Sequence, residues 1–326
     1  MKFIEISQPG GSEVLKVSHQ DIPSIGNDEV LIGVKAAGVN RPDILQRQGK
    51  YPMPAGVTNV PGLEVAGIIE SIGKDVVGFS VGDQVCALTN GGGYAEYCAV
   101  PFTQVLPMPK NLSFMEAAAI PETFFTVWAN LFDLGRASKD DVVLIHGGAS
   151  GIGSTALILC KALGIKAIST VGQDDKVNVL SHYGKIINYK KADFEKEVLS
   201  LTKGKGVDVI LDIVGAPYFN KNMTLLKKDG RLVIIGYMGG QVVERFDLQQ
   251  LMLKRATITG STMRGRSAEE KHIIAKELVA KVWPLIESGE CKPMIYQVFD
   301  FNDVKKAHEA LDKGDHIGKV VLTLET

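Results

Sequence analysis

The sequence predicts an α/β protein that contains a doubly wound parallel sheet and a second, β-rich domain. Three observations support this. From Asp141 onward, short apolar runs alternate with helical stretches, as in a parallel sheet covered by helices. A glycine-rich turn joins the first of these runs to the first helix. The preceding 120 or so residues instead combine glycine, proline and short apolar runs, which is typical of a barrel or partial barrel.

Composition restricts the class of protein before any motif is considered. The chain has 326 residues, enough for two domains, with 45% hydrophobic and 22% charged residues and a formal net charge of −1. A net charge so close to zero provides no excess of positive charge to attract nucleic acid or an anionic membrane, so we expect neither as a partner. The first residues indicate a strand and a turn, not a targeting segment. Four scattered cysteines without a secretion signal predict free thiols in a reducing cytoplasm: Cys86, Cys98, Cys160 and Cys291.

Two helices are expected between the β-rich part and the parallel sheet. Ser113 and Glu116 have the spacing of a capping box, which predicts a helix start. A longer helix should follow Pro121 and run toward Leu134, with Gly135 as its stop.

Six candidate strands form the predicted parallel sheet: residues 142–145, 166–171, 186–188, 209–212, 231–235 and 257–260. Residues 268–286 are helical and amphipathic in pattern. The tail, residues 298–324, carries a further strand at 319–322 that could return to the first domain.

The glycine-rich turn predicts a phosphate site. It connects the apolar run 142–145 to a helical stretch that ends at Gly164. Glycines let the backbone approach a pyrophosphate, and the start of a helix offers free amides and a favourable dipole. Ser150 occupies the middle glycine position of Gly-x-Gly-x-x-Gly, so the match is imperfect, and His146 before the turn is interpreted as a buried structural residue. The predicted phosphate contacts are Ser150, Gly151, Ile152 and Gly153.

Three segments carry a resemblance over essentially the whole chain: NRPDILQRQGKY at residues 40–51, AAAIPE at 117–122 and IGKVVL at 317–322. With them, the chain resembles the zinc-lacking, zeta-crystallin-like quinone oxidoreductases of the medium-chain dehydrogenase/reductase superfamily, nearest to the tumour-suppressor-inducible branch. The resemblance implies a GroES-like catalytic domain at residues 1–121, a Rossmann NADP-binding domain at 122–265 and a return to the catalytic domain at 266–326. It also implies NADPH-dependent reduction of quinones.

The residue types argue against the catalytic zinc found elsewhere in that superfamily. Zinc alcohol dehydrogenases have a cysteine where this chain has Asn40, and a histidine where it has Leu63. Leucine offers no lone pair to a metal and asparagine is a poor zinc ligand. The four-cysteine structural zinc lobe is also missing, so we expect no metal.

The end of the second parallel strand favours NADPH. NAD-specific enzymes place a carboxylate there to bind the ribose hydroxyls, whereas this chain has Val171 followed by Gly172. The resemblance implies that Lys176 and Tyr189 contact the 2′-phosphate. The alternatives are that Lys176 is a solvated helix residue and Tyr189 a core aromatic.

Two acidic residues, Asp174 and Asp175, weaken the NADPH assignment and are interpreted as helix N-terminal residues that point away. The resemblance places further cofactor contacts at strand ends and in the tail: Gly215, Gly236, Tyr237, Met238, Ser261, Thr262, Met263 and Lys319. Ordinary strand-end turns are the alternative for the first seven.

Asn40, Tyr51 and Thr126 are the candidate catalytic residues and are also expected to contact the cofactor; the resemblance supports Asn40 and Tyr51 more than Thr126. Asn40 could orient the nicotinamide or a substrate carbonyl, Tyr51 could stack on or bond a flat acceptor, and Thr126 could contact the nicotinamide or its ribose. The alternatives are a turn residue, loop packing and a helix residue bonded to its own backbone.

Two other functions stay open. The same scaffold serves enal or enoyl-thioester reductases, for which Tyr51 could donate a proton. A non-catalytic NADPH-sensing or RNA-binding role is the alternative from another class, although the near-neutral charge opposes an RNA interface. Family members are often homodimers, which we expect here too.

Overall fold

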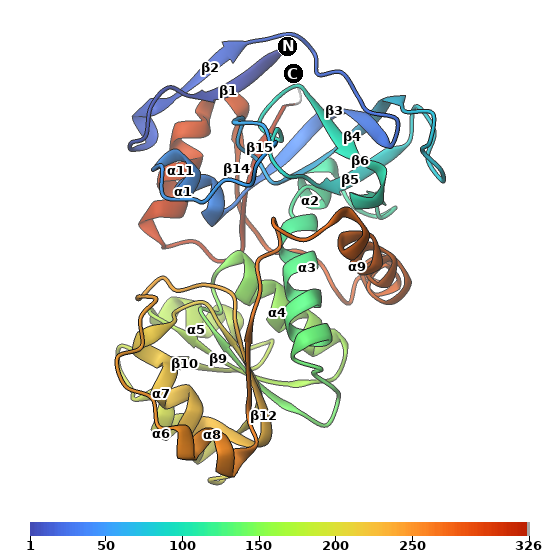
Figure 1. Cartoon of the computed structure of the whole chain (residues 1–326). Helices are drawn as coiled ribbons and strands as arrows, with labels where there is room; N and C mark the ends of the chain where they lie inside the picture. Colours follow the sequence, from blue (N-terminus) through green and yellow to red (C-terminus); the bar gives the residue numbers. More distant parts are fainter. Residues whose placement is uncertain (325–326) are drawn as a thin grey trace. The chain divides into compact units, whose positions relative to one another are not determined.

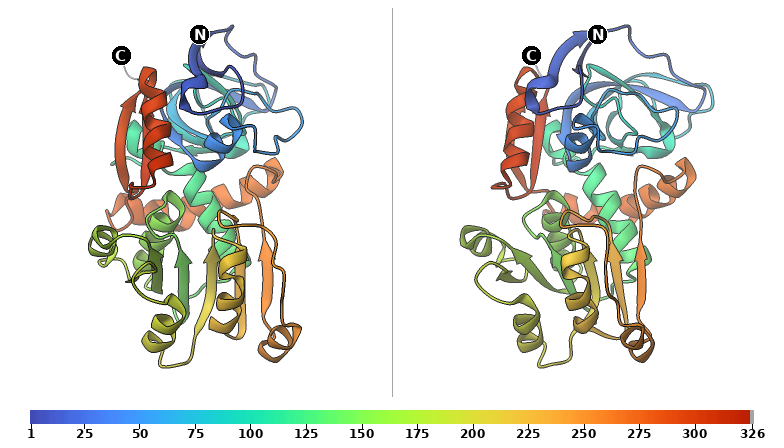
Figure 2. Two further views of the ribbon diagram at one scale, coloured as in Figure 1. Left: turned by 90° about the vertical axis from the view of Figure 1, so that its left-hand side faces the viewer. Right: turned by 60° about the vertical axis from the view of Figure 1, so that its left-hand side comes forward.

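A computed structural model describes residues 1–324 and divides into two compact units (Figures 1 and 2). Unit 1 comprises Met1–Phe125 and Arg264–Thr326, and unit 2 comprises Thr126–Met263. Unit 2 is therefore an insertion between two stretches of unit 1. Each unit has its own sheet and its own apolar core.

Unit 1 is built on a seven-stranded sheet in which β14, β15, β3, β4, β5 and β7 follow one another and β6 pairs with β3. The sheet strands are β3 (Glu29–Val39), β4 (Glu64–Ile72), β5 (Gln84–Leu88), β6 (Tyr97–Pro101), β7 (Val105–Pro107), β14 (Ile295–Asp300) and β15 (Lys319–Thr323). A separate antiparallel pair is formed by β1 (Lys2–Ile6) and β2 (Leu15–His19). Val320 pairs with Val39, so the predicted tail strand does return to the first part of the chain.

The helices of unit 1 surround this sheet: α1 (Arg41–Arg47), α2 (Phe114–Ala117), α9 (Ala268–Lys281), α10 (Trp283–Glu287) and α11 (Val304–Lys313). The capping box predicted from Ser113 and Glu116 is confirmed, because each side chain bonds the other residue's backbone N–H. Figure 1 shows the N-terminal pair β1 and β2 close to α11.

Unit 2 contains a six-stranded, all-parallel sheet in the order β10, β9, β8, β11, β12, β13. Its strands are β8 (Val142–His146), β9 (Lys166–Val171), β10 (Lys185–Asn188), β11 (Val207–Asp212), β12 (Leu226–Ile234) and β13 (Thr257–Gly260). Its helices after β8 are α4 (Gly151–Ala162), α5 (Asp174–Leu180), α6 (Phe194–Leu201), α7 (Ala216–Leu225) and α8 (Leu248–Lys254). All six predicted strands are present. The order reverses between β8 and β11, which is where such sheets bind nucleotides.

The helix expected from Pro121 to Leu134 changes geometry on the way. It is α-helical as α3 (Pro121–Val127) and becomes a π-helix over Trp128–Leu134. The wider turn is visible in the bond from the Gly135 N–H to the Asn130 carbonyl, five residues back, at 2.9 Å. Gly135 ends it, as predicted. Within residues 1–324 we find no helix whose length and apolarity would suffice to cross a membrane.

Candidate functional site

The glycine-rich turn of unit 2 lies between the end of β8 and the start of α4. Ser150 is the N-cap of α4, and its Oγ accepts a bond from the Gly153 N–H at 3.0 Å. A Cβ on Gly153 would lie 2.3 Å from the Gly147 carbonyl oxygen, so only glycine allows this close packing of helix and strand. Serine at the middle glycine position is therefore a helix cap. The N–H groups of Gly151 and Ile152, at the first turn, have no intrahelical acceptor and could serve an anion.

His146 has the structural role that the sequence predicts. Its ring is buried, with Nδ1 3.1 Å from Thr170 Oγ1 and Nε2 2.7 Å from Asn222 Oδ1. Burial lowers the pKa of His146 to about 4, so the ring is neutral at physiological pH.

The residues expected around a 2′-phosphate also occur together in unit 2. Val171 ends β9 and Gly172 follows it; a Cβ on Gly172 would lie 2.9 Å from the Tyr189 hydroxyl. Tyr189 is 42% exposed, so it is not a core aromatic. Lys176 is only 5% exposed, so it is not a solvated helix residue. Both alternatives from the sequence are therefore wrong, while the phosphate contact itself stays a prediction.

The two acidic residues begin α5, as expected. Asp174 is exposed and is held by the Asn188 amide, which donates at 2.6 Å, and by an ion pair with Lys191. Its carboxylate is thus occupied by neighbours, and these bonds lower the pKa of Asp174.

The strand ends expected near the nicotinamide show varied environments. Gly215, after β11, has φ +83°, and a Cβ there would lie 2.5 Å from the carbonyl oxygen of Gly240 in the loop after β12. The close approach of that loop therefore requires glycine at position 215. Tyr237 and Met238 in that loop are exposed. The remaining members of the predicted set differ in exposure: Gly236 and Ser261 are half-buried, Thr262 is exposed and Met263 is buried.

Thr126 is the buried polar side chain of unit 2 that lacks a partner. Asn130 donates to the Thr126 carbonyl at 2.8 Å and accepts from Ser261 Oγ at 2.7 Å, yet Thr126 Oγ1 makes no hydrogen bond within residues 1–324. The alternative that this hydroxyl bonds its own backbone is therefore wrong. A buried hydroxyl without a partner costs stability, which fits a group kept for a ligand.

In unit 1, Asn40 is held at both ends of its amide. Its Nδ2 donates to Glu64 Oε1 at 2.9 Å and its Oδ1 accepts from the Lys319 ammonium. Lys319 is 3% exposed and also bonds Glu64 Oε1 at 2.6 Å and the Val39 carbonyl at 3.3 Å. All three ammonium protons are thus directed at protein oxygens. Lys319 as a cofactor contact stays a prediction that would require one of these bonds to break.

A second buried chain of bonds fixes the backbone of Asn40. Asp43 accepts from the Asn40 N–H at 2.8 Å and from the Tyr94 hydroxyl at 3.2 Å. Tyr94 in turn lies 3.3 Å from His308 Nε2, and His308 Nδ1 lies 3.3 Å from Arg47. Burial raises the pKa of Asp43 to about 6 and lowers that of His308 to about 3, so His308 is neutral.

Tyr51 lies beside the cation of Arg264 in unit 1. The Arg264 guanidinium is 5.1 Å from the centre of its ring, within the range of a cation–π contact. Asn90 fixes Arg264 through its carbonyl at 2.7 Å and Lys271 through its Oδ1 at 2.6 Å. Burial raises the pKa of Tyr51 and lowers that of Lys271 to about 8.

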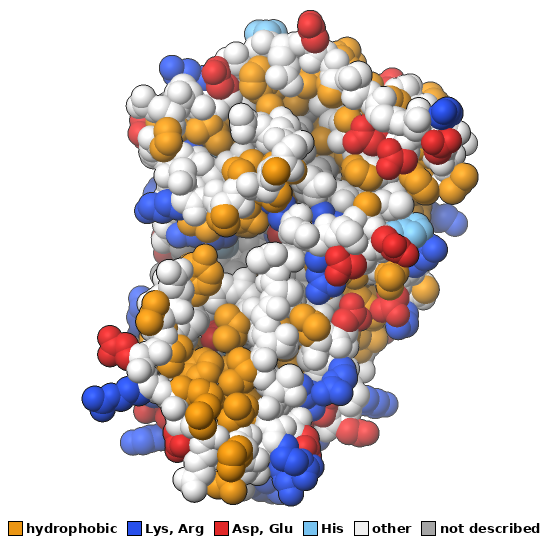
Figure 3. Space-filling view, viewed as in Figure 1, with side chains coloured by type: hydrophobic (Ala, Val, Ile, Leu, Met, Phe, Trp, Pro, Cys, Tyr) orange, Lys and Arg blue, Asp and Glu red, His pale blue; other side chains and the backbone are white. Residues whose placement is uncertain are grey.

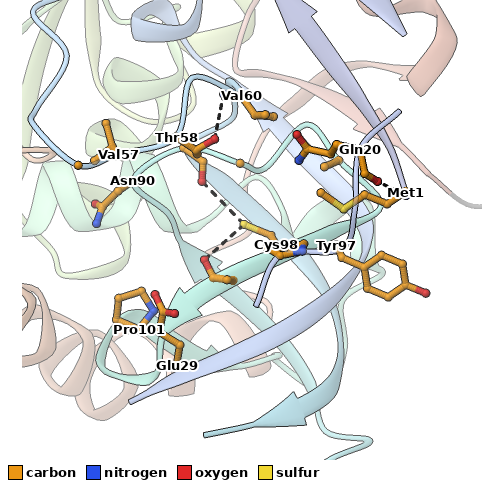
Figure 4. A pocket seen from close by; sticks show the side chains of 16 residues that line it. Met1, Gln20, Glu29, Val57, Thr58, Val60, Asn90, Tyr97, Cys98 and Pro101 are labelled. Atoms are coloured by element: carbon orange, nitrogen blue, oxygen red, sulfur yellow. Dashed lines mark hydrogen bonds between the residues drawn. The ribbon is translucent and has the colours of Figure 1, made fainter. Parts of the chain in front are cut away.

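A separate cavity of about 250 Å³ lies within unit 1 (Figure 4). Figure 4 shows Thr58, Asn90 and Cys98 at its wall, and Cys98 Sγ lies 3.8 Å from the Gly91 carbonyl. Burial raises the pKa of the Cys98 thiol to about 12, so it is no nucleophile at neutral pH. As predicted, all four cysteines are free.

The positions that hold catalytic zinc in alcohol dehydrogenases are filled by the bonded Asn40 and the buried Leu63. Across residues 1–324 we find no group of three or more histidine, cysteine, aspartate or glutamate side chains arranged for a metal ion.

Five charged residues of unit 1 that are buried or half-buried are not predicted by any sequence motif: Asp43, Glu64, Glu122, Arg264 and Lys271. The only local signal was a charge within an apolar stretch, as for Glu64 at the start of β4 and Glu122 after the alanine run. Many of the groups that they bond come from segments far away in the chain, so spacing alone could not reveal them.

Comparison with known proteins identifies the family. Residues 26–110 match the alcohol dehydrogenase GroES-like domain and residues 151–279 the zinc-binding dehydrogenase domain. A quinone oxidoreductase of Rattus norvegicus is 32% identical, with 99% of this chain and 98% of that protein covered. The Escherichia coli quinone oxidoreductase complexed with NADPH is 28% identical, covers 99% of this chain and all of its own, and has a TM-score of 0.87. The CurK enoyl reductase is 26% identical at a TM-score of 0.84, covering 99% of this chain and 98% of its own. The chain belongs to the quinone oxidoreductases of the medium-chain dehydrogenase/reductase superfamily.

Proposed function

We propose that this protein reduces quinones with NADPH and without a metal. The observation that carries the proposal is the strand–glycine turn–helix of unit 2, at the point where the strand order reverses. The relatives named quinone oxidoreductases, and the NADPH complex of one of them, support the same reaction.

NADPH, when bound, supplies a hydride; the chain supplies position and charge. The first-turn amides of α4 would bind the pyrophosphate, while Ser150 stabilises the start of the helix as its N-cap. Lys176 and Tyr189 would read the 2′-phosphate, and the unpartnered Thr126 hydroxyl would receive a bond from the nicotinamide end. The other expected cofactor contacts are Gly172, Gly215, Gly236, Tyr237, Met238, Ser261, Thr262, Met263 and Lys319.

In unit 1, the proposed roles fall to Asn40 and Tyr51. Asn40 is rigidly oriented by Glu64 and Lys319, so it would fix the geometry of a ring or carbonyl at little entropic cost. Tyr51 offers a half-buried ring with a guanidinium beside it, suited to a flat acceptor.

Cofactor choice and metal dependence test the proposal together. Oxidation of NADPH and NADH is measured over a quinone panel, with and without a chelator. Lys176→Ala should raise KM for NADPH about tenfold or more while changing that for NADH little, since a charge-assisted bond contributes about 1.5–3 kcal/mol. Lys185→Ala, an exposed lysine of the same unit, is the matched control. Equal losses for both cofactors would contradict the phosphate contact, and activity lost to the chelator and restored by zinc would contradict the metal-free reaction.

A second candidate reaction is the reduction of an enal or enoyl thioester. The likeness to CurK enoyl reductase favours it. Relative kcat/KM for 1,2-naphthoquinone, an alkenal and a crotonyl thioester separates the two, and a preference of more than about tenfold for the thioester would replace quinone reduction as the main activity.

For assembly we propose a cytoplasmic homodimer that binds neither nucleic acid nor membranes. Unit 2 exposes large apolar side chains, and Figure 3 shows hydrophobic atoms gathered where Figure 1 labels α7 and α8. The loop between β12 and α8, together with α8 itself, has these exposed apolar residues: Tyr237, Met238, Val242, Leu248, Met252 and Leu253. Light scattering at micromolar concentration should give twice 35.2 kDa, and a monomer there would contradict the dimer. A gel-shift on RNA should show no shift at 50–200 mM salt.

A further inference from the structure

Glu122 is a half-buried carboxyl that the proposed reaction has not yet used. It is the second residue of α3, and its backbone N–H donates to Glu64 Oε2 at 2.9 Å. Its own carboxyl forms no hydrogen bond or ion pair with any group in residues 1–324, yet it is not cut off from solvent. Its oxygens are therefore available to water or to a bound ligand.

Charged groups from four other segments of unit 1 act on Glu122. Glu64 on β4 and Asp43 on α1 disfavour its ionisation, whereas Lys319 on β15 and Lys271 on α9 favour it. Tyr51 belongs to the same group, because the charge of Glu122 contributes to raising the pKa of its hydroxyl.

We propose that Glu122 donates the proton that accompanies reduction of the acceptor. The inference rests on the proposed function. Hydride addition leaves the acceptor as an anion; the O–H bond of the Glu122 carboxyl breaks and its proton bonds to the acceptor oxygen. The carboxylate then regains a proton from water, to which it remains accessible. One NADPH, one quinone and one proton thus give NADP⁺ and one hydroquinone.

Among the acids near Tyr51, Glu122 suits this step better than Tyr51 itself. Burial and the neighbouring Glu64 raise the pKa of Glu122 to about 8, so the carboxyl carries its proton at pH 7 and releases it readily. Burial raises the pKa of the Tyr51 hydroxyl above its usual 10, which makes it the weaker acid.

The first test is the pH profile of kcat on a quinone for the full-length protein. In the wild type, kcat should fall as the pH rises through about 8, because the donor loses its proton. Glu122→Gln should lower kcat at pH 7 roughly a hundredfold and abolish the fall, as expected for a lost general acid. Glu122→Asp should retain a fall at a shifted pH. Glu287→Gln, an exposed glutamate of the same unit, should match the wild type.

Lys271 is the competing titrating group, because its pKa is also about 8. Lys271→Gln should keep the fall in kcat and move it to higher pH, since the ammonium charge that lowers the pKa of Glu122 is gone. Difference infrared spectra without NADPH provide a readout independent of turnover: a carboxyl band should vanish near pH 8 in the wild type and be missing in Glu122→Gln.

Three results would overturn the proposal: an unchanged pH profile in Glu122→Gln, a fall abolished only by Lys271→Gln, or a wild-type infrared spectrum without the band. If Glu122→Gln does not fold, as judged by circular dichroism, an unshifted fall in Glu122→Asp overturns it instead. A wild-type protein that oxidises no NADPH with any quinone would refute the proposed function and with it the reaction step. The infrared titration would still show whether the Glu122 carboxyl ionises near pH 8, so the two failures are distinguishable.

Discussion

Replacing Lys319 by methionine tests whether its ammonium belongs to the protein or to the cofactor. Lys319 is 3% and Glu64 0% exposed, and they form a 2.6 Å ion pair. Methionine fills much of the same volume but leaves the Glu64 carboxylate with only the Asn40 amide and the Glu122 N–H as donors. Breaking a buried pair on one side typically costs about 3–5 kcal/mol. We therefore expect Lys319→Met to destabilise unit 1 by that amount.

The assay is urea unfolding followed by tryptophan fluorescence. The chain has two tryptophans, Trp128 in unit 2 and Trp283 in unit 1, so a Trp128→Phe background reports on unit 1 alone. The control is Lys281→Met, which removes an exposed ion pair with Glu277 and should lower the free energy of unfolding of unit 1 by only about 0.3–0.5 kcal/mol.

Adding Glu64→Gln to Lys319→Met should recover part of the loss, because no buried charge then lacks a partner. If the free energy of unfolding of Lys319→Met lies within about 0.5 kcal/mol of the wild-type value and NADPH binding is weakened instead, the ammonium serves the cofactor and its proposed role in stabilising unit 1 is wrong.

Three further predictions follow from individual contacts. Thr126→Val removes a buried hydroxyl without a partner, so unit 2 should gain about 1 kcal/mol in thermal unfolding while the Kd for NADPH rises; loss of stability would contradict this. Gly153→Ala puts a Cβ 2.3 Å from the Gly147 carbonyl and should cost about 1–3 kcal/mol and abolish NADPH binding in fluorescence titrations; wild-type binding would disprove the tight packing. Asp43→Asn tests linkage. The folded pKa of about 6 exceeds the ordinary 3.8, so the native state holds a proton that the unfolded state has lost, and stability falls as the pH rises. Relative to the variant, the wild-type free energy of unfolding should fall by about 2 kcal/mol between pH 4 and pH 6, and parallel curves would exclude this linkage.

Local pattern predicts the elements of this chain well. The six parallel strands are apolar runs bounded by turns, and the capping box at Ser113 and the stop at Gly135 are local too. The change to a π-helix at Trp128 was missed, because one extra residue in a turn leaves no trace in a hydrophobic pattern.

The same distinction between local pattern and long-range packing applies to the residues of the candidate site. Its phosphate turn is one continuous segment with a recognisable spacing. The Asn40 amide instead depends on Glu64 and Lys319, which lie 24 and 279 residues away in sequence. Whether Lys176 is buried or Tyr189 exposed is likewise decided by packing, which a motif does not encode.

The position of β15 has a consequence for biosynthesis. Unit 2 has left the ribosome in full once Met263 has emerged. The unit 1 sheet then still lacks β14 and β15, of which β15 pairs with β14 on one side and β3 on the other. Until residues 319–323 arrive, residues 36–39 of β3 present an open edge that can pair with other chains. The same strand delivers the ammonium that neutralises Glu64, so the nascent first segment carries both an unpaired edge and an uncompensated carboxylate. A holding chaperone that covers apolar edges during synthesis should therefore bind the first segment of unit 1 in preference to unit 2.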